Sequence, residues 1–292
     1  MPSLTEARKF QELLNLPAND SPYLFDKIFD NSGFWARRLS KKKFKLLKNI
    51  DPAIRAMLQP GESVCFLTWG VGEATVDSFL LGNLTAYINH RAFVLTTSRI
   101  LLIQLTPGRK TAMLRGQVEY AGISKVGSSL LGNLTITFHN AEKTIFSQVP
   151  KADRKFLGQL IDGLRQQIAQ SGRKNLSAQS DLCPHCYKIV DTRPESCPHC
   201  AGPFKSARRA ILLSFILPGL GYWYLGYKFI SLIPMIISAI IWFAIIVILL
   251  DSASPSEALE LIFPLVFFYA FSVIATYSIA KKGIYPVAKK DP

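Results

Sequence analysis

Two long apolar stretches near the end of the chain constrain its fold more than any other feature. Between Ala210 and Ala280 only four residues are charged: Lys228, Asp251, Glu257 and Glu260. Phe229–Leu250 and Leu259–Ala280 each hold 22 residues. As helices these are about 33 Å long at about 1.5 Å per residue, which matches a hydrocarbon core of about 30 Å. We expect both stretches to span a membrane.

A third apolar stretch, Ala210–Tyr227, is shorter and contains helix-breaking residues. It holds Pro218 and three glycines: Gly219, Gly221 and Gly226. Proline lacks a backbone N–H and glycine adopts turn conformations readily, so a continuous helix is disfavoured. We interpret the stretch as a re-entrant or interfacial hairpin that turns at Pro218 and Gly219. A third full span is the alternative.

Charge placement favours two crossings over three, because Lys and Arg close to a span tend to stay on the cytoplasmic side. Basic residues flank the apolar region at both ends: Lys205, Arg208, Arg209, Lys281, Lys282, Lys289 and Lys290. The loop expected over Asp251–Glu260 has no Lys or Arg. We therefore expect a multi-pass protein of the cytoplasmic (inner) membrane, with its N-terminal domains and its C-terminus in the cytosol.

The hairpin also carries a motif. Residues 219–226 read G-x-G-x-x-Y-L-G. The motif resembles the signature of small bacterial membrane domains built from a short hairpin followed by transmembrane helices. The resemblance implies a bacterial protein whose residues 205–292 form a membrane domain, with the hairpin at 210–227 and spans at 229–250 and 259–280. It implies a topology and no particular chemistry.

Four of the five cysteines form two C-P-H-C turns separated by ten residues: Cys183, Cys186, Cys197 and Cys200. Each turn directs two thiolates to one point, and four sulfurs at about 2.3 Å make the tetrahedral cage that structural zinc prefers. Because cysteine fills every position, no open site is left for catalysis. We predict a structural Zn²⁺ with these four ligands; iron in a rubredoxin-like site is the alternative.

His185 and His199 occupy the third position of each turn. At that position the backbone amide normally faces the sulfur, so we do not expect either imidazole to bind the metal. Residues 181–204 resemble the zinc-ribbon class. That class binds proteins, nucleic acids or only its own zinc.

The chain is basic, with 34 Lys plus Arg against 20 Asp plus Glu and a net charge of +14. Residues 210–292 hold 5 Lys and 4 Asp or Glu, so the excess lies almost wholly before Ala210. Anionic lipid headgroups explain this excess where Arg208 and Arg209 directly precede the membrane segment. We favour that reading over binding to nucleic acid.

Residues 1–60 are predicted to form a helical basic arm. The expected helices are Leu4–Leu14, Pro22–Phe29 after a Ser21 cap, Phe34–Lys48, and Pro52–Leu58 after an Asp51 cap. A dense basic run could lie on an anionic membrane, or it could be a solvated face whose apolar residues dock on the next domain. The candidate headgroup contacts are Arg37, Arg38, Lys41, Lys42, Lys43, Lys45, Lys205, Arg208 and Arg209.

Residues 61–170 alternate apolar and polar residues in a way that predicts an antiparallel sheet followed by a helix. The expected strands are Ser63–Trp69, Thr85–Asn89, Ala92–Thr96, Ile100–Leu105, Gln117–Tyr120, Leu134–His139 and Lys143–Gln148. The expected helix is Ala152–Ile168, and residues 171–180 are a linker. The order of elements and the hairpin around Thr96–Arg99 resemble the bacterial pleckstrin-homology-like domains, which act as interaction or oligomerising modules beside membranes.

Together these features predict a multi-domain α+β membrane protein: helical arm, pleckstrin-homology-like domain, zinc ribbon and transmembrane helices. We found no P-loop, H-E-x-x-H, G-x-S-x-G or convincing carboxylate pair, so we do not expect an enzyme. The expected function is binding or scaffolding at the inner membrane; a regulatory or core subunit of a transport or channel assembly is the alternative. Expected partners are the lipid bilayer, an unidentified protein and a second copy of the chain.

Overall fold

A computed structural model describes residues 10, 12–14, 21–29, 34–72, 84–129, 133–170, 179–190, 193–250 and 255–287. The chain divides into two compact units. One consists of residues 1–73 and 86–191, and the other of residues 74–85 and 192–292. The first unit contains a large antiparallel sheet with helices, and the second is mainly helical. The chain therefore has the α+β character expected from the sequence.

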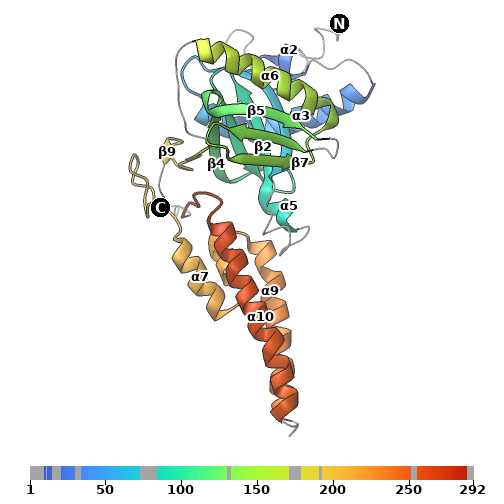
Figure 1. Ribbon diagram of the computed structural model, residues 1–292, viewed down its shortest axis with the longest axis vertical. Helices are drawn as coiled ribbons and strands as arrows, with labels where there is room; N and C mark the ends of the chain where they lie inside the picture. The colour runs from blue at the N-terminus through green and yellow to red at the C-terminus, as the bar shows by residue number, and fades with distance from the viewer. Residues whose placement is uncertain are drawn as a thin grey trace. The chain divides into compact units, whose positions relative to one another are not determined.

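Nine strands form one sheet in the first unit (Figure 1), in the order β5-β6-β7-β1-β2-β3-β4-β8-β9. The strands are β1 (Val64–Gly72), β2 (His90–Thr96), β3 (Arg99–Leu105), β4 (Thr111–Glu119), β5 (Ile123–Ser128), β6 (Leu134–Phe138), β7 (Lys143–Ser147), β8 (Ser180–Leu182) and β9 (Ile189–Val190). All neighbouring strands are antiparallel. Strand β1 joins the β2–β4 half to the β5–β7 half.

Helices cover both faces of the central strands. The helices described before β8 include α2 (Phe25–Ile28), α3 (Phe34–Met57), α5 (Leu84–Asn89), the 3₁₀ turn η1 (Tyr120–Gly122) and α6 (Lys151–Gln170). One buried cluster joins α2 and α3 to side chains such as Leu67. The other joins α6 to side chains such as the adjacent Phe66. Since neighbouring residues of a strand face opposite sides, both faces of β1 are buried.

Within residues 61–170 the sequence predicted most of the strands and missed three features, and it did not predict that β8 and β9 extend the sheet. Thr85–Asn89 belongs to helix α5 and is not a strand, so that prediction is wrong. In so short a segment, contacts with the rest of the fold outweigh strand propensity; here Gln104 Nε2 donates to the Ile88 carbonyl at 2.8 Å. Gln117–Tyr120 is only the end of a longer strand, β4, and β5 was not predicted.

The N-terminal arm differs from the prediction in its breaks. Pro52 lies inside α3, so the helices expected to be separate are one. The buried stripe continues through Ile50, Ala53 and Ile54, and its burial offsets the cost of about 3 kcal/mol for an internal proline. Helix α2 begins after Leu24 rather than after a Ser21 cap. The helix predicted over Leu4–Leu14 lies largely outside the described residues.

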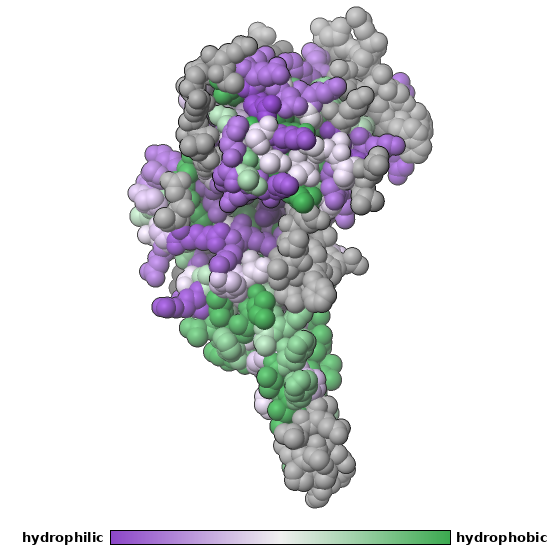
Figure 2. All heavy atoms as spheres, viewed as in Figure 1, coloured by the Kyte–Doolittle hydropathy of each residue, from purple (hydrophilic) through white to green (hydrophobic). Residues whose placement is uncertain are grey.

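The second unit contains α7 (Ala207–Ile216), α8 (Leu220–Leu225), α9 (Lys228–Leu250) and α10 (Pro255–Ala280), with α9 and α10 antiparallel in Figure 1. Two described stretches are long and apolar enough to cross a membrane, Lys228–Ile248 and Ile262–Ala280. Helix α10 begins at Pro255, so the loop expected over Asp251–Glu260 is partly helical. Figure 2 shows hydrophobic residues gathered over these helices.

The stretch Ala210–Tyr227 forms two short helices, α7 and α8, with a turn between them at Pro218 and Gly219. Helix α7 ends at Ile216, and Gly219 has a φ of 99°, which glycine adopts without strain. A Cβ at Gly219 would lie 2.5 Å from the Ser231 carbonyl oxygen, and one at Gly221 would lie 2.2 Å from Ser214 Oγ. The two glycines of the G-x-G motif therefore let α8 pack closely against α9 and α7.

The interior of the helical unit contains small polar side chains. Ser214 on α7 and Thr276 on α10 hydrogen-bond at 2.7 Å, and the Thr276 hydroxyl also lies 2.8 Å from the Ser272 carbonyl oxygen. Trp242 Nε1 donates to the Tyr269 hydroxyl at 3.1 Å. These contacts join helices whose outward faces are apolar, an arrangement that is common between helices in lipid.

Candidate metal centre

The four predicted ligands lie together. The Sγ atoms of Cys183, Cys186, Cys197 and Cys200 are all within 4.8 Å of one another. A tetrahedral site with metal–sulfur bonds of about 2.3 Å needs sulfurs about 3.8 Å apart, so only small adjustments separate this arrangement from a closed cage. The cysteines could therefore hold one metal ion, as the sequence predicted.

The two C-P-H-C turns share one backbone conformation. The N–H of His185 points to Cys183 Sγ at 3.4 Å, and the N–H of His199 points to Cys197 Sγ at the same distance. Tyr187 and Ala201, each directly after the second cysteine, have positive φ angles of 58° and 55°. Both histidines thus face the sulfur through their backbone amides, as expected, and these N–H groups would stabilise a thiolate.

The first turn is anchored by the sheet. Cys183 follows β8, and its N–H donates to the Lys188 carbonyl at 2.9 Å, which closes the β8–β9 hairpin. Leu182 is buried, and Tyr187 and Ile189 pack against the same apolar cluster. The first two ligands are therefore held on a short, rigid hairpin.

The second turn is anchored by the segment that follows α10. The Cys197 N–H donates to the Gly202 carbonyl at 2.9 Å. Beyond it, Phe204 forms a β-bridge with Pro286, and the Lys205 N–H donates to the Tyr285 carbonyl at 2.9 Å. The chain after this turn is thus paired with residues that follow the apolar helix α10.

The basic residues of α3 are not equivalent. Arg37, Arg38, Lys41, Lys42 and Lys45 are exposed. Lys43 is fully buried, so the prediction that it contacts lipid headgroups is wrong.

A buried ion pair holds Lys43. Its Nζ lies 2.8 Å from Asp153 Oδ1 on α6, with side-chain exposures of 0% and 2%. It also lies 3.9 Å from the centre of the Phe66 ring, and Asp153 accepts a hydrogen bond from the Thr68 hydroxyl at 2.6 Å. Burial lowers the pKa of Lys43, and the charge of Asp153 opposes that shift. The pair joins α3 to α6 beside β1.

The Thr96–Arg99 turn that suggested a family resemblance is itself part of a buried network. Arg99 Nε lies 3.1 Å from Glu62 Oε1, and another guanidinium nitrogen donates to the Met57 carbonyl at 2.8 Å. Arg99 also donates to the Gln117 side chain, and the Thr96 hydroxyl lies 2.5 Å from Glu62 Oε1. The turn residues therefore fix the end of α3 to the β2–β3 hairpin. No local sequence pattern identified Glu62 as the partner.

The remaining predicted headgroup contacts lie where α7 begins. Arg208 and Arg209 are exposed in its first turn, and Lys205 is partly buried just before it. Burial lowers the pKa of Lys205, and the nearby charge of Lys228 lowers it further. The fifth cysteine, Cys65, lies in β1; burial raises the pKa of its thiol, which disfavours the reactive thiolate.

Comparisons with known proteins assign no family to this chain. No protein-family model matches the sequence, and no curated protein matches it. One solved structure with detectable similarity is the crystal structure of the C-terminal domain of an unknown protein from Leishmania infantum. It has 11% identity and a TM-score of 0.30, and the match covers 40% of this chain and 99% of that chain. Similarity this weak carries no argument about fold or function.

Proposed function

We propose that the protein is a membrane-anchored binding or scaffolding protein whose soluble domains face the cytosol and whose four cysteines hold a structural zinc ion. The observation that carries the proposal is the outward apolar surface of α9 and α10. In the most apolar 18-residue stretch of each helix, only 22% is buried in α9 and 28% in α10. Large side chains such as Phe243 and Phe263 are 69% and 77% exposed. A patch of this extent is stable in lipid and prone to aggregate in water.

The end of the apolar region fits the level of lipid headgroups. Both candidate spans have one end at the same side of the helical unit, at Lys228 and at Ala280. The hairpin of α7 and α8 begins and ends on that side as well, because α7 follows Ser206 and α8 leads into α9. Tyrosines, tryptophan and lysines gather there, as is typical of a membrane interface. This arrangement supports two crossings.

Zinc is the metal that fits the site best. Four thiolates without an open position suit a structural ion, and a segment as short as residues 181–204 buries too little apolar surface to fold alone. Metal binding would then supply most of the folding free energy of this segment. Iron is the alternative that metal analysis distinguishes.

The sheet unit supports a binding role. Its antiparallel strands β1–β7 are followed by helix α6, and this order of elements supports the resemblance to pleckstrin-homology-like domains on which the proposed binding role rests. The exposed basic face of α3 adds a surface that attracts anionic partners. Among the described residues of this unit, the buried charged side chains pair with one another inside the fold: Lys43 with Asp153, and Arg99 with Glu62.

Labelling of introduced cysteines in intact cells tests the membrane arrangement. Ser252→Cys, between the two spans, should react with an impermeant maleimide added outside, whereas Lys42→Cys on exposed α3 should react only after the cells are opened. Labelling of both from the same side contradicts the proposed orientation. Release of the full chain by alkaline carbonate without detergent contradicts membrane anchoring. Crosslinking in membranes should then recover a protein partner; recovery of the chain alone contradicts scaffolding.

A further inference from the structure

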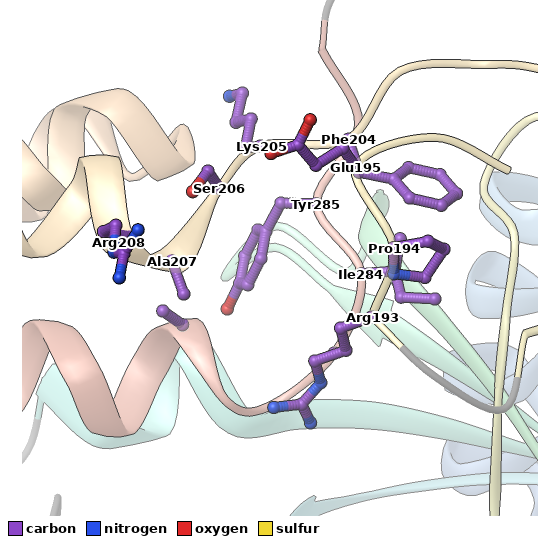
Figure 3. A pocket seen from close by; sticks show the side chains of 12 residues that line it. Arg193, Pro194, Glu195, Phe204, Lys205, Ser206, Ala207, Arg208, Ile284 and Tyr285 are labelled. Atoms are coloured by element: carbon purple, nitrogen blue, oxygen red, sulfur yellow. The ribbon is translucent and has the colours of Figure 1, made fainter.

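A cavity lies within the second unit, at the end where its apolar helices stop. Its volume is about 320 Å³, at the small end of the range for ligand pockets. Three segments line it: Arg193–Glu195, Phe204–Arg208 and the end of α10 with the chain after it, at Ala280 and Gly283–Tyr285. Figure 3 shows these side chains around the cavity.

The lining carries more positive than negative charge. Arg193, Lys205 and Arg208 contribute three cations, and Glu195 is the one carboxylate among the lining residues. In the described part of the chain no ion pair joins Glu195 to Lys205. Lys228, at the start of α9, is close enough to Lys205 to repel its charge. An anion in the cavity would relieve this repulsion.

The backbone adds hydrogen-bond donors. The Ser206 hydroxyl accepts the N–H of Arg209 at 3.4 Å. The N–H groups of Ala207 and Arg208, in the first turn of the ten-residue α7, have no acceptor within the helix. Arg208 and Lys205 line the same cavity, so their cationic side chains and these N–H groups are charged or polarised donors available to a phosphate group in it.

The position of the cavity indicates the source of the phosphate. Ala280 is both the end of a candidate span and part of the cavity lining. Lys205 lies 5.8 Å from the centre of the Tyr224 ring, and Lys228 lies 5.8 Å from that of Trp223. Exposed apolar side chains of α7, such as Leu212 and Phe215, continue from this level. A lipid could therefore place its phosphate in the cavity and its acyl chains against apolar helix surface.

We propose that this cavity binds the phosphate group of one anionic phospholipid. The proposal rests on the proposed membrane function and goes beyond a diffuse basic surface, because it assigns the contact to particular residues. Arg208 lines the cavity and Arg209 does not, although both are exposed and adjacent in sequence. Diffuse attraction to a membrane would use the two arginines equally, whereas a built pocket uses Arg208.

Lipid binding to the purified full-length chain tests the proposal. The chain is washed in mild detergent and mixed with phosphatidylglycerol, phosphatidylcholine or inorganic phosphate, and bound molecules are counted by native mass spectrometry. We expect one phosphatidylglycerol per chain and weaker binding of the other two. Lys205→Gln and Arg208→Gln should each weaken phosphatidylglycerol binding about tenfold, as expected for a lost charge-assisted hydrogen bond. Arg209→Gln should change it less than about twofold.

Each contrary result has one meaning. Equal losses for Arg208→Gln and Arg209→Gln, or no retained phosphatidylglycerol, overturn the pocket. Inorganic phosphate bound as tightly as phosphatidylglycerol overturns the lipid source. An unchanged metal content in every variant shows that the variants are folded. If the chain also stays dispersed without detergent, the proposed membrane function fails; if it needs detergent but retains no lipid, only this inference fails.

Discussion

The sheet unit and the helical unit place their apolar residues in opposite ways. In the sheet unit, large side chains such as Leu67 and Phe93 are buried, and the lysines and arginines of α3 face outward, apart from Lys43. In the helical unit, large side chains such as Ile240 face outward, and hydroxyl groups such as those of Ser214 and Thr276 are buried. Each arrangement is stable in a different solvent, the first in water and the second in lipid.

The comparison shows which forces hold each region. Burial of apolar surface holds the sheet unit, whereas in the proposed membrane arrangement close packing and hydrogen bonds between helices would hold the helical unit. In the segment that carries the four cysteines, the β8–β9 hairpin shares the apolar burial of the sheet unit, whereas the second cysteine turn has little of either contact. Variants that disturb apolar burial, helix packing or metal binding should therefore each destabilise a different region of the chain.

Loss of the metal should have the largest effect, and it should be local. Cys197→Ser removes one thiolate, and structural zinc contributes about 10–16 kcal/mol to the folding of small zinc domains. We expect the wild-type chain to hold one metal ion and Cys197→Ser to lose it, with fast hydrogen exchange over residues 181–204. Elemental analysis and exchange mass spectrometry measure both quantities.

Cys65→Ser provides the matched control. Cys65 lies in β1 and is not among the four clustered cysteines, so its substitution should leave the metal content unchanged. Exchange in β1 and α6 should stay slow when the metal is lost, because apolar burial holds them. Unfolding of the whole sheet on metal loss would contradict the separation of forces.

Breaking the buried ion pair should have the next largest effect, confined to the sheet unit. Lys43→Met leaves Asp153 charged and buried without its cationic partner, with only the Thr68 hydroxyl still bound to it, which costs about 3–5 kcal/mol. Hydrogen exchange of α3 and β1 amides in the detergent-solubilised chain measures the loss. Lys42→Met, at the exposed neighbouring position, should change stability by no more than about 0.5 kcal/mol.

A double variant tests the cause. Adding Asp153→Asn to Lys43→Met removes the uncompensated carboxylate and should recover part of the loss. No recovery would mean that lost packing of the lysine stem, and not the unpaired charge, destabilises the single variant. Equal effects of Lys43→Met and Lys42→Met would contradict the burial of Lys43.

Replacing a glycine with alanine should destabilise the helical unit and stabilise the sheet unit. A Cβ at Gly221 would lie 2.5 Å from the Ala210 carbonyl oxygen, whereas one at Gly163 in α6 would meet nothing within 4 Å. Gly221→Ala should destabilise the helical unit by about 1–3 kcal/mol through overpacking. Gly163→Ala should stabilise α6 by about 0.5–1 kcal/mol.

Thermal unfolding in detergent, followed by exchange of α8 and α6 amides, measures these two effects. A neutral Gly221→Ala would show that the short helices of the hairpin are packed more loosely than the structure indicates. It would also weaken the view that the G-x-G motif serves close approach of α8.

The sequence was sufficient wherever the signal was local. The spacing of the cysteines predicted the cluster of four that could hold a metal ion, and the Pro218–Gly219 pair predicted the turn between α7 and α8, because both depend on neighbouring residues. Lys43 was misassigned because its neighbours in sequence are exposed cations. Its helical phase was the available signal, since it lies three and four residues before the buried Leu46 and Leu47.

Other features could not be predicted locally. The partner of Lys43, Asp153, lies on α6 and is separated from Lys43 in sequence by strands β1–β7. The proline predicted a break at Pro52, but helix α3 continues through it because its apolar side chains pack against the sheet. Arg193 and Tyr285 line one cavity, but they are far apart in the sequence, on either side of the four helices α7–α10. Long-range contacts of this kind are set by the fold.

The smallest expected effect is a pH dependence confined to the sheet unit. Burial lowers the pKa of His90 at the start of β2, and the charges of Arg109 and Arg91 lower it further. The folded chain therefore keeps His90 neutral at pH values where the unfolded chain, with an ordinary pKa of about 6.5, already binds a proton. Stability should fall as the pH drops below about 6.5 and level off below the folded pKa.

His90→Gln should flatten this slope in unfolding measurements of the sheet unit between pH 5 and about pH 8, whereas His139→Gln, at an exposed turn, controls for loss of an imidazole elsewhere. The buried polar groups described in helices α7–α10 are serine, threonine and tyrosine hydroxyls, which do not change charge in this range. A slope of equal size in the helical unit would therefore contradict the comparison, since it would require a titrating group inside a region that the hydroxyl contacts hold together.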